Sequence, residues 1–261
     1  MAEDAVAERL RRAELEVVGR FATASNATLL VRLRADDGSW PVLPLDPDGD
    51  LVLGELDPDG FAVYKPRRGE APLWDFPSGT LYLREVAAHA VDRLLGWDLV
   101  PTTVVREEAP HGVGAFQRFV PHDPGEHYFA LLERGDEGLL EQLRRMVLFD
   151  AVIDNADRKG GHVLLEGDRV RLVDHGVSFS EQAKLRTVGW HFAGEPVPDG
   201  ARAEVAALAD MLVRGDAAVA VLEPLLSDGE RRRLLERARA VAGWDRYPEP
   251  VGERPYPWPL L

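Results

Sequence analysis

Two short polar runs hold the side chains with the greatest capacity for chemistry. The first combines carboxylates, an amide and two cations at Asp154, Asn155, Asp157, Arg158 and Lys159. The second is Asp174-His175-Gly176. Carboxylates and cations gathered at one place suit a divalent metal ion together with a multiply charged anion. A solvated loop with capping aspartates is the alternative interpretation, but the second acidic run favours a site.

Two β-rich segments join these runs and should bring them together. HVLLE and RVRLVD flank Gly167-Asp168, a pattern that predicts a β-hairpin with a tight turn. Because the two ends of a hairpin lie side by side, we expect His162 and Asp174 to come close. The apolar spacing of residues 137–152 predicts an amphipathic helix just before the first run.

The basic residues carry a second signal. Only three of the 31 cations are lysines, and they are Lys65, Lys159 and Lys184. Because the chain has arginine at almost every basic position, each lysine is a candidate for a role that arginine could not fill. Lys65 stands at the end of AVYKP, which is predicted to be a strand.

The remaining elements divide the chain into a β-rich first part and a mainly helical second part. A helical pattern covers residues 5–16, and a longer helix runs from a Ser78 cap to about Leu95, with Gly96 as its stop. Strands are expected in residues 14–21, 28–35, 99–105 and 114–120, and helices in 200–243. We therefore expect one lobe over 1–120, a second over 121–245, and a Pro-rich tail over 246–261 that packs across the surface or frays.

Composition excludes several classes of protein. The 261 residues are 45% hydrophobic and 29% charged, as in ordinary globular proteins, and contain no cysteine for disulfides, thiolate metal sites or nucleophilic catalysis. The formal net charge of −14 disfavours nucleic acid and stable membrane association. With no apolar stretch near 20 residues and no apolar signal core, we expect a cytoplasmic protein.

The spacing of the polar runs also resembles a family. LFDAVIDNADRKGGHVLL and LVDHGVSF are similar to the catalytic loop and metal-binding segment of the protein-kinase-like superfamily, and most closely to type II phosphatidylinositol 4-kinases. AVYKP, REVAAHAVDRLLGWDLVPTTVV and GAFQRFV resemble the nucleotide-lysine strand, regulatory helix and interlobe linker. More narrowly, the chain resembles actinobacterial phosphatidylinositol 3-/4-kinase-related proteins. The resemblance spans about residues 19–192 and implies an α+β, two-lobed protein-kinase-like fold, with a β-rich N-lobe and a mainly helical C-lobe.

The resemblance also implies a role for each matching residue. Lys65 would neutralise ATP phosphates and Glu85 would orient it, unless both are ordinary solvated side chains. Asp157, with Arg158 beside it, would accept or orient the acceptor hydroxyl, and Asp174 would bind the metal. In the linker, Gln117, Phe119 and Val120 would contact adenine. A loop before the second strand, with Ser25 and Asn26, would cover the phosphates.

His162 departs from the family, which usually has Asn at this metal-ligand position. Imidazole suits manganese, iron or zinc better than magnesium, so His162 is either a ligand that shifts metal choice or a packing residue. As a ligand, it should lose metal as the pH falls through about 6.5, the reference pKa of histidine. Asn155 either replaces the missing amide or braces the loop, and His175 stands beside the metal ligand.

The resemblance therefore implies an ATP-dependent phosphotransferase that uses Mg or Mn. The acceptor is expected to be a protein or a small molecule rather than a lipid. A nucleotide-binding pseudokinase is the first alternative, because of His162 and a phosphate loop that is not rich in glycine. A metallohydrolase is the second, with metal ligands drawn from Asp154, Asp157, His162, Asp174 and His175.

Overall fold

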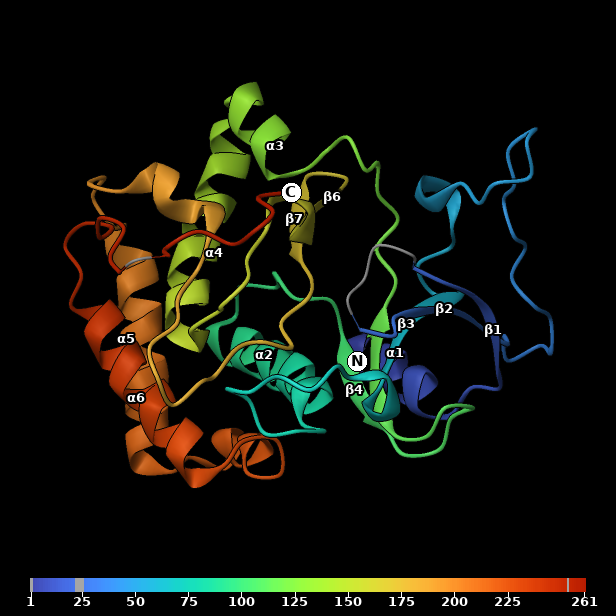
Figure 1. Ribbon diagram of the computed structural model, residues 1–261, viewed down its shortest axis with the longest axis horizontal. Coiled ribbons are helices and arrows are strands. Elements are labelled where there is room, and N and C mark those ends of the chain that lie inside the picture. The colour runs from blue at the N-terminus through green and yellow to red at the C-terminus, as the bar shows by residue number, and fades with distance from the viewer. Residues whose placement is uncertain (1, 22–25, 253) are drawn as a thin grey trace.

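A five-stranded antiparallel sheet forms the N-terminal part of the molecule. The computed structural model describes residues 2–21, 26–252 and 254–261. Helix α1 (Ala2–Arg12) is followed by strands in the spatial order β1-β2-β3-β5-β4 (Figure 1). The strands are β1 (Leu15–Arg20), β2 (Leu29–Leu33), β3 (Phe61–Pro66), β4 (Thr103–Arg106) and β5 (Gly114–Arg118).

Alternation along β2 explains why the sheet buries both of its faces. Val31 and Leu33 pack with Leu10 of α1 on one face, whereas Leu30 packs with Phe61 and Phe119 on the other. Successive side chains of a strand point to opposite faces, so a run of apolar residues serves two cores. Strand β3 is central, between β2 and β5, and this fixes the place of Lys65 opposite Ala115.

Helix α2 (Leu81–Leu95) lies between the sheet and the C-terminal helices (Figure 1). Gly96 ends it in the left-handed conformation at a φ of 72°, as its C-terminal glycine predicts. The predicted Ser78 cap is wrong. The residue before the helix is Thr80, whose hydroxyl donates instead to the Pro77 carbonyl.

The second part of the chain is mainly helical. Its helices are α3 (Tyr128–Arg134), α4 (Glu137–Ile153), α5 (Asp199–Arg214) and α6 (Asp228–Ala242), and its only named strands within the described residues form the hairpin of β6 (Val163–Glu166) and β7 (Arg169–Leu172). One apolar core joins these helices to α2. The α+β class is confirmed, because an antiparallel sheet and a mainly helical part lie on either side of α2 (Figure 1).

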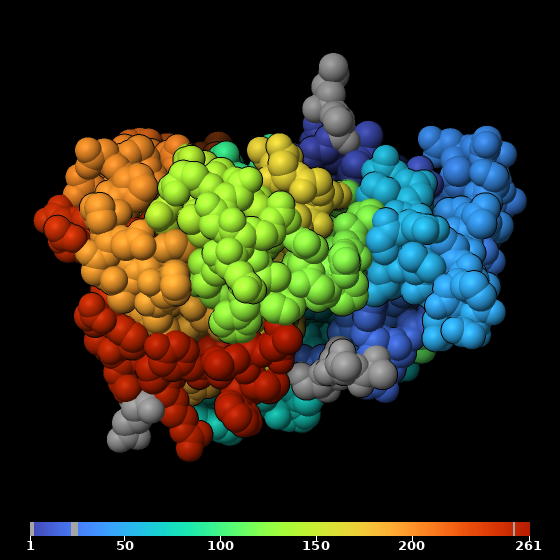
Figure 2. Space-filling model, turned by 90° about the horizontal axis from the view of Figure 1, so that it is seen from above, coloured from blue at the N-terminus to red at the C-terminus, as the bar shows by residue number. Residues whose placement is uncertain are grey.

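The Pro-rich tail packs across the helical lobe (Figure 2). The Pro255 carbonyl accepts from the Thr187 N–H and from the indole of Trp190, and the Leu260 carbonyl accepts from the Gly160 N–H at 2.7 Å. The tail therefore contacts the polar run that begins at Asp154. Across the described residues, we find no helix with the combined length and apolar character needed to span a membrane.

Candidate active site

Lys65 lies between two carboxylates from distant parts of the chain. Its Nζ is 2.5 Å from Glu85 Oε1 on α2 and 3.0 Å from Asp174 Oδ1 beyond β7. Burial alone lowers the pKa of Lys65, but attraction to Asp174 and Glu85 outweighs burial and raises that pKa above its usual value. Lys65 is therefore a fixed cation where the sheet meets the helical lobe.

The hairpin brings His162 and Asp174 together as expected. His162 Nε2 lies 3.3 Å from Asp174 Oδ2, and the first and last residues of the hairpin pair, Val163 with Leu172. Burial lowers the pKa of His162 to about 4 against the attraction of Asp174, so the imidazole is neutral at pH 7. Burial alone raises the pKa of Asp174, but Lys65 and His162 together hold it below its usual range.

Asp157 is held by its own loop. Its backbone N–H donates to Asn155 Oδ1 at 3.0 Å, and its carboxylate lies 3.0 Å from Lys159 Nζ. Burial raises the pKa of Asp157, and the ammonium of Lys159 opposes that rise. Asn155 is fully buried and also donates to Asp150, so it braces the loop.

Arg158 lies beneath the cleft instead of lining it. Its guanidinium is fully buried, forms an ion pair with Asp150 of α4 and donates to the Val173 carbonyl at 2.8 Å. It also donates to the His162 carbonyl at 3.4 Å. Arg158 thus fixes both ends of the hairpin, and the catalytic role expected for it from the sequence would have to act through these contacts.

Two adjoining cavities surround the Lys65 ammonium. The larger, about 370 Å³, is lined by residues that include Lys65, Gln117, Phe119, Val120, His162 and Asp174. The smaller, about 70 Å³, is lined by Asn26, Lys65, Glu85, Asp157 and Asp174 among others. Lys65 and Asp174 line both cavities, so their ion pair stands at the boundary between them.

Two linker residues are already engaged in the protein's own hydrogen bonds. The Phe119 N–H, expected to be available to adenine, donates to the Phe61 carbonyl at 3.1 Å. The Val120 carbonyl lies 2.7 Å from His122 Nδ1. Gln117 is buried and donates to Thr103, so its side chain supports the floor of the cleft.

Some lining residues have no clear signal in the sequence. Thr28, Leu53 and Leu164 line the larger cavity, and Lys159 lines it beside them. Of these residues the sequence singled out only Lys159, through the polar run and the rarity of lysine, and gave it no role. Asn26 accepts from the Ala71 N–H at 2.8 Å at the edge of the smaller cavity, and Ser25 lies outside the described residues.

The five residues of the metallohydrolase hypothesis do not form one metal site. Asp154 accepts from the Lys184 backbone N–H at 3.1 Å, and the ring of His175 is fully buried edge-on to Phe149. Among the described residues, no group of three or more His, Asp or Glu side chains is placed to hold a metal ion. The pair His162 and Asp174 remains as the candidate donor set.

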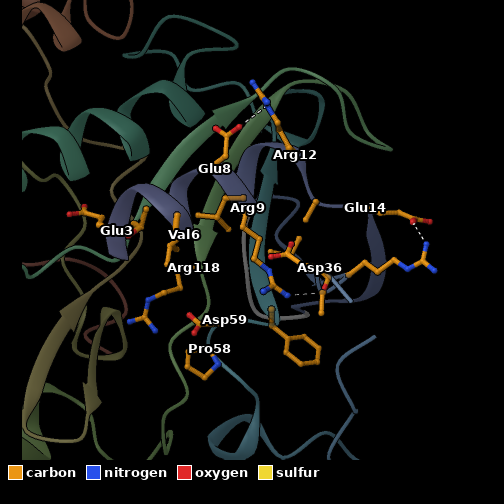
Figure 3. A pocket seen from close by; sticks show the side chains of 18 of the residues that line it. Glu3, Val6, Glu8, Arg9, Arg12, Glu14, Asp36, Pro58, Asp59 and Arg118 are labelled. Carbon is orange, nitrogen blue, oxygen red and sulfur yellow. Dashed lines mark hydrogen bonds and ion pairs between the residues drawn. The ribbon is translucent and has the colours of Figure 1, made fainter. Parts of the chain in front are cut away.

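A larger hollow, about 1200 Å³, lies elsewhere, beside α1 (Figure 3). Several of its charged side chains are paired within the protein, since Arg12 pairs with Glu8, Arg34 with Glu14 and Arg118 with Glu166. None of the site residues expected from the sequence lines it. Size alone therefore does not make it the active site.

No family model matches the sequence. Among solved structures, the Golgi casein kinase aligns at 14% identity and a TM-score of 0.48, over 92% of this chain and 74% of that chain. The kinase CtkA of Helicobacter pylori aligns at 11% identity and a TM-score of 0.44, over 88% of this chain and 92% of that chain.

The sequence comparison gives a much stronger match. Protein Rv2133c of Mycobacterium tuberculosis is 38% identical over 280 aligned residues, which cover 95% of this chain and 92% of the relative. Identity at this level over nearly the whole of both chains shows common descent. The chain therefore belongs to the family of protein Rv2133c.

Proposed function

We propose that this protein is an ATP-dependent phosphotransferase that uses a divalent metal ion. The observation that carries the proposal is the position of Lys65, paired with Glu85 and Asp174 at the boundary of two cavities. A fixed ammonium and an ionised carboxylate are the groups needed to receive phosphates with their metal. The larger cavity then holds the nucleotide, and the smaller one leads to Asp157.

The donor atoms at the hairpin fit a divalent metal. Asp174 offers a carboxylate and His162 a neutral imidazole, 3.3 Å apart. Both are ordinary metal ligands, and phosphate oxygens and water can complete the coordination. When bound, the metal would supply positive charge against the phosphates. Lys65 would add its own charge there, and Asp157 would accept the proton of the attacking hydroxyl.

The acceptor is proposed to be a protein or a small molecule. A net charge of −14 repels anionic lipid surfaces, which makes an inositol lipid the least favoured acceptor. Relationship to type II phosphatidylinositol 4-kinases stays a proposal that rests on the order of Lys65, Glu85, Asp157-Arg158 and Asp174-x-Gly176 along the chain.

One observation favours a nucleotide-binding pseudokinase as a second candidate. Within the described residues the donor pair is one carboxylate and one imidazole, and His162 replaces the usual Asn. Such a protein would bind nucleotide without transferring phosphate. Turnover alone separates the two candidates, since both need Lys65 and Asp174.

The test begins with nucleotide binding. ATP with Mg, Mn or Zn should raise the melting temperature, because ligand at 100 times its Kd adds about 2.7 kcal/mol to the folded state. Asp174→Asn is the control and should show no metal-dependent shift. Radiolabelled ATP then reports self-labelling, hydrolysis and transfer to lysate. Absence of any nucleotide-dependent shift with all three metals would contradict both candidates.

A further inference from the structure

Two consecutive residues of α2 grip the segment that follows Asp174. Arg84 and Glu85 are almost fully buried, at 1% and 3% exposed. Glu85 Oε2 accepts from the His175 N–H at 3.0 Å, and Arg84 Nε donates to the Ser178 carbonyl at 3.0 Å. The position of Glu85 relative to Lys65 is thus tied to that of Arg84.

The rest of the Arg84 guanidinium is also engaged. One terminal nitrogen donates to the carbonyl and the hydroxyl of Thr80, and the other forms an ion pair with Glu230 at the start of α6. The aromatic ring of Phe76 lies 5.2 Å from the guanidinium carbon. A planar donor with this many fixed partners holds one orientation, as lysine could not.

Helix α6 is itself fixed where it meets Arg84. Glu230 belongs to a capping box, and its second oxygen accepts from the Ser227 N–H at 2.8 Å. Seven residues later, nearly two helical turns along the same face, Arg237 donates to the Ser180 and Val152 carbonyls at 2.9 Å. Helix α6 therefore contacts both α2 and the segment after Asp174.

We propose that Arg84 and Glu230 form a latch from α6 to α2 that keeps Glu85 facing Lys65 without a partner or a modification. This inference rests on the proposed function, since it concerns how the phosphate-binding lysine is positioned. Without the Glu230 carboxylate, the buried guanidinium keeps only the neutral oxygens of Thr80 and Ser178 and loses its charge partner, which favours an outward movement of α2 toward water. That movement withdraws Glu85. Arg84 and Glu230 are positioning residues that act through Glu85.

The first experiment measures the Kd for ATP in Glu230→Gln. If α2 occupies the assembled position only about a tenth of the time, the apparent Kd rises about tenfold. Glu204→Gln is the matched control, since Glu204 accepts from the Trp97 indole at 2.6 Å just beyond the far end of α2. Its Kd should stay within about twofold of wild type.

A double-mutant cycle separates positioning from general destabilisation. In a Glu85→Gln background, Glu230→Gln should weaken ATP binding by less than about twofold, because the residue through which it acts is already lost. The latch would be overturned if Glu230→Gln had the same Kd for ATP as wild type. It would also be overturned if Glu230→Gln raised the Kd by the same factor in the Glu85→Gln background as in wild type.

Hydrogen exchange without nucleotide tests the latch independently of the proposed function. Arg84→Lys keeps the positive charge and can be used even if Glu230→Gln does not fold. Compared with wild type, Arg84→Lys should show faster amide exchange in residues 81–95 and 174–180 and unchanged exchange in α5. Equal rates in wild type and Arg84→Lys would reject the latch. Faster exchange in a protein that binds no ATP would instead retain the latch and reject the proposed function.

Discussion

Replacement of His162 by asparagine should change how stability depends on pH in the metal-free protein. The His162 side chain is 15% exposed and has a pKa of about 4, compared with a reference value of about 6.5. Between these two values the unfolded chain binds a proton that the folded protein does not. The contribution of the neutral imidazole to the free energy of unfolding is therefore at its full value above pH 6.5, and it is lost as the pH falls toward 4.

The magnitude follows from the separation of the two pKa values. About 2.5 pKa units at about 1.4 kcal/mol each correspond to between about 3 and 4 kcal/mol in full, and about 3 kcal/mol of this is lost by pH 4, where the folded-state imidazole is half protonated. The free energy of unfolding of wild type, relative to His162→Asn, should fall by this amount between pH 7.5 and pH 4. Asparagine does not titrate and keeps a polar group beside Asp174.

Urea denaturation with a metal chelator, at several pH values from 7.5 to 4, measures this difference. His191→Asn is the matched control, because His191 is exposed and lies outside the cleft, and its curve should follow wild type. A constant difference between wild type and His162→Asn across the whole range would refute the reasoning, since the buried imidazole would then not resist protonation.

The other predictions concern metal and nucleotide. Metal binding, measured by titration calorimetry, should favour Mn over Mg and should weaken near pH 4, not near pH 6.5 as the sequence alone suggests. His162→Asn should restore the use of Mg. Lys65→Met should reduce kcat/KM by about 100-fold or more, whereas Lys184→Met should keep nucleotide use because Lys184 pairs with Asp75 away from both cavities; equal losses in steady-state assays would contradict this. Asp174→Asn should abolish metal-dependent transfer, whereas Asp157→Asn should keep ATP affinity and slow transfer. An equal loss of ATP affinity in both variants, measured by calorimetry, would contradict this division of roles.

Local patterns in the sequence were sufficient for the elements that carry the site. The hairpin turn at Gly167 predicted that His162 and Asp174 would meet, and they do. This contact follows from a short turn, which acts over a few residues. The pairing of Lys65 with Glu85 was implied only by the family resemblance, and the two side chains lie 2.5 Å apart.

Contacts between distant segments could not be predicted in the same way. Arg158 looked like part of a polar site, yet its partner Asp150 lies inside an amphipathic helix whose pattern says nothing of a buried ion pair. Helix α3 was missed because proline, glycine and histidine precede it. Glu230 lies in residues 200–243, for which only helices were expected, and only the folded chain places Arg84 against it.

All three lysines of this chain are ion-paired, two of them at the cleft and Lys184 away from it, with consequences for chemical labelling. Lys65 pairs with Glu85 and Asp174, Lys159 pairs with Asp157, and Lys184 pairs with Asp75.

An amine-reactive acyl phosphate of ATP would therefore meet very few side-chain amines, and two of the three line the proposed nucleotide cavity. Acylation needs the neutral amine, which the raised pKa of Lys65 makes scarce while Asp174 stays beside it. The yield of modified Lys65, normalised to Lys184 in the same digest, would report by mass spectrometry how often that ion pair opens.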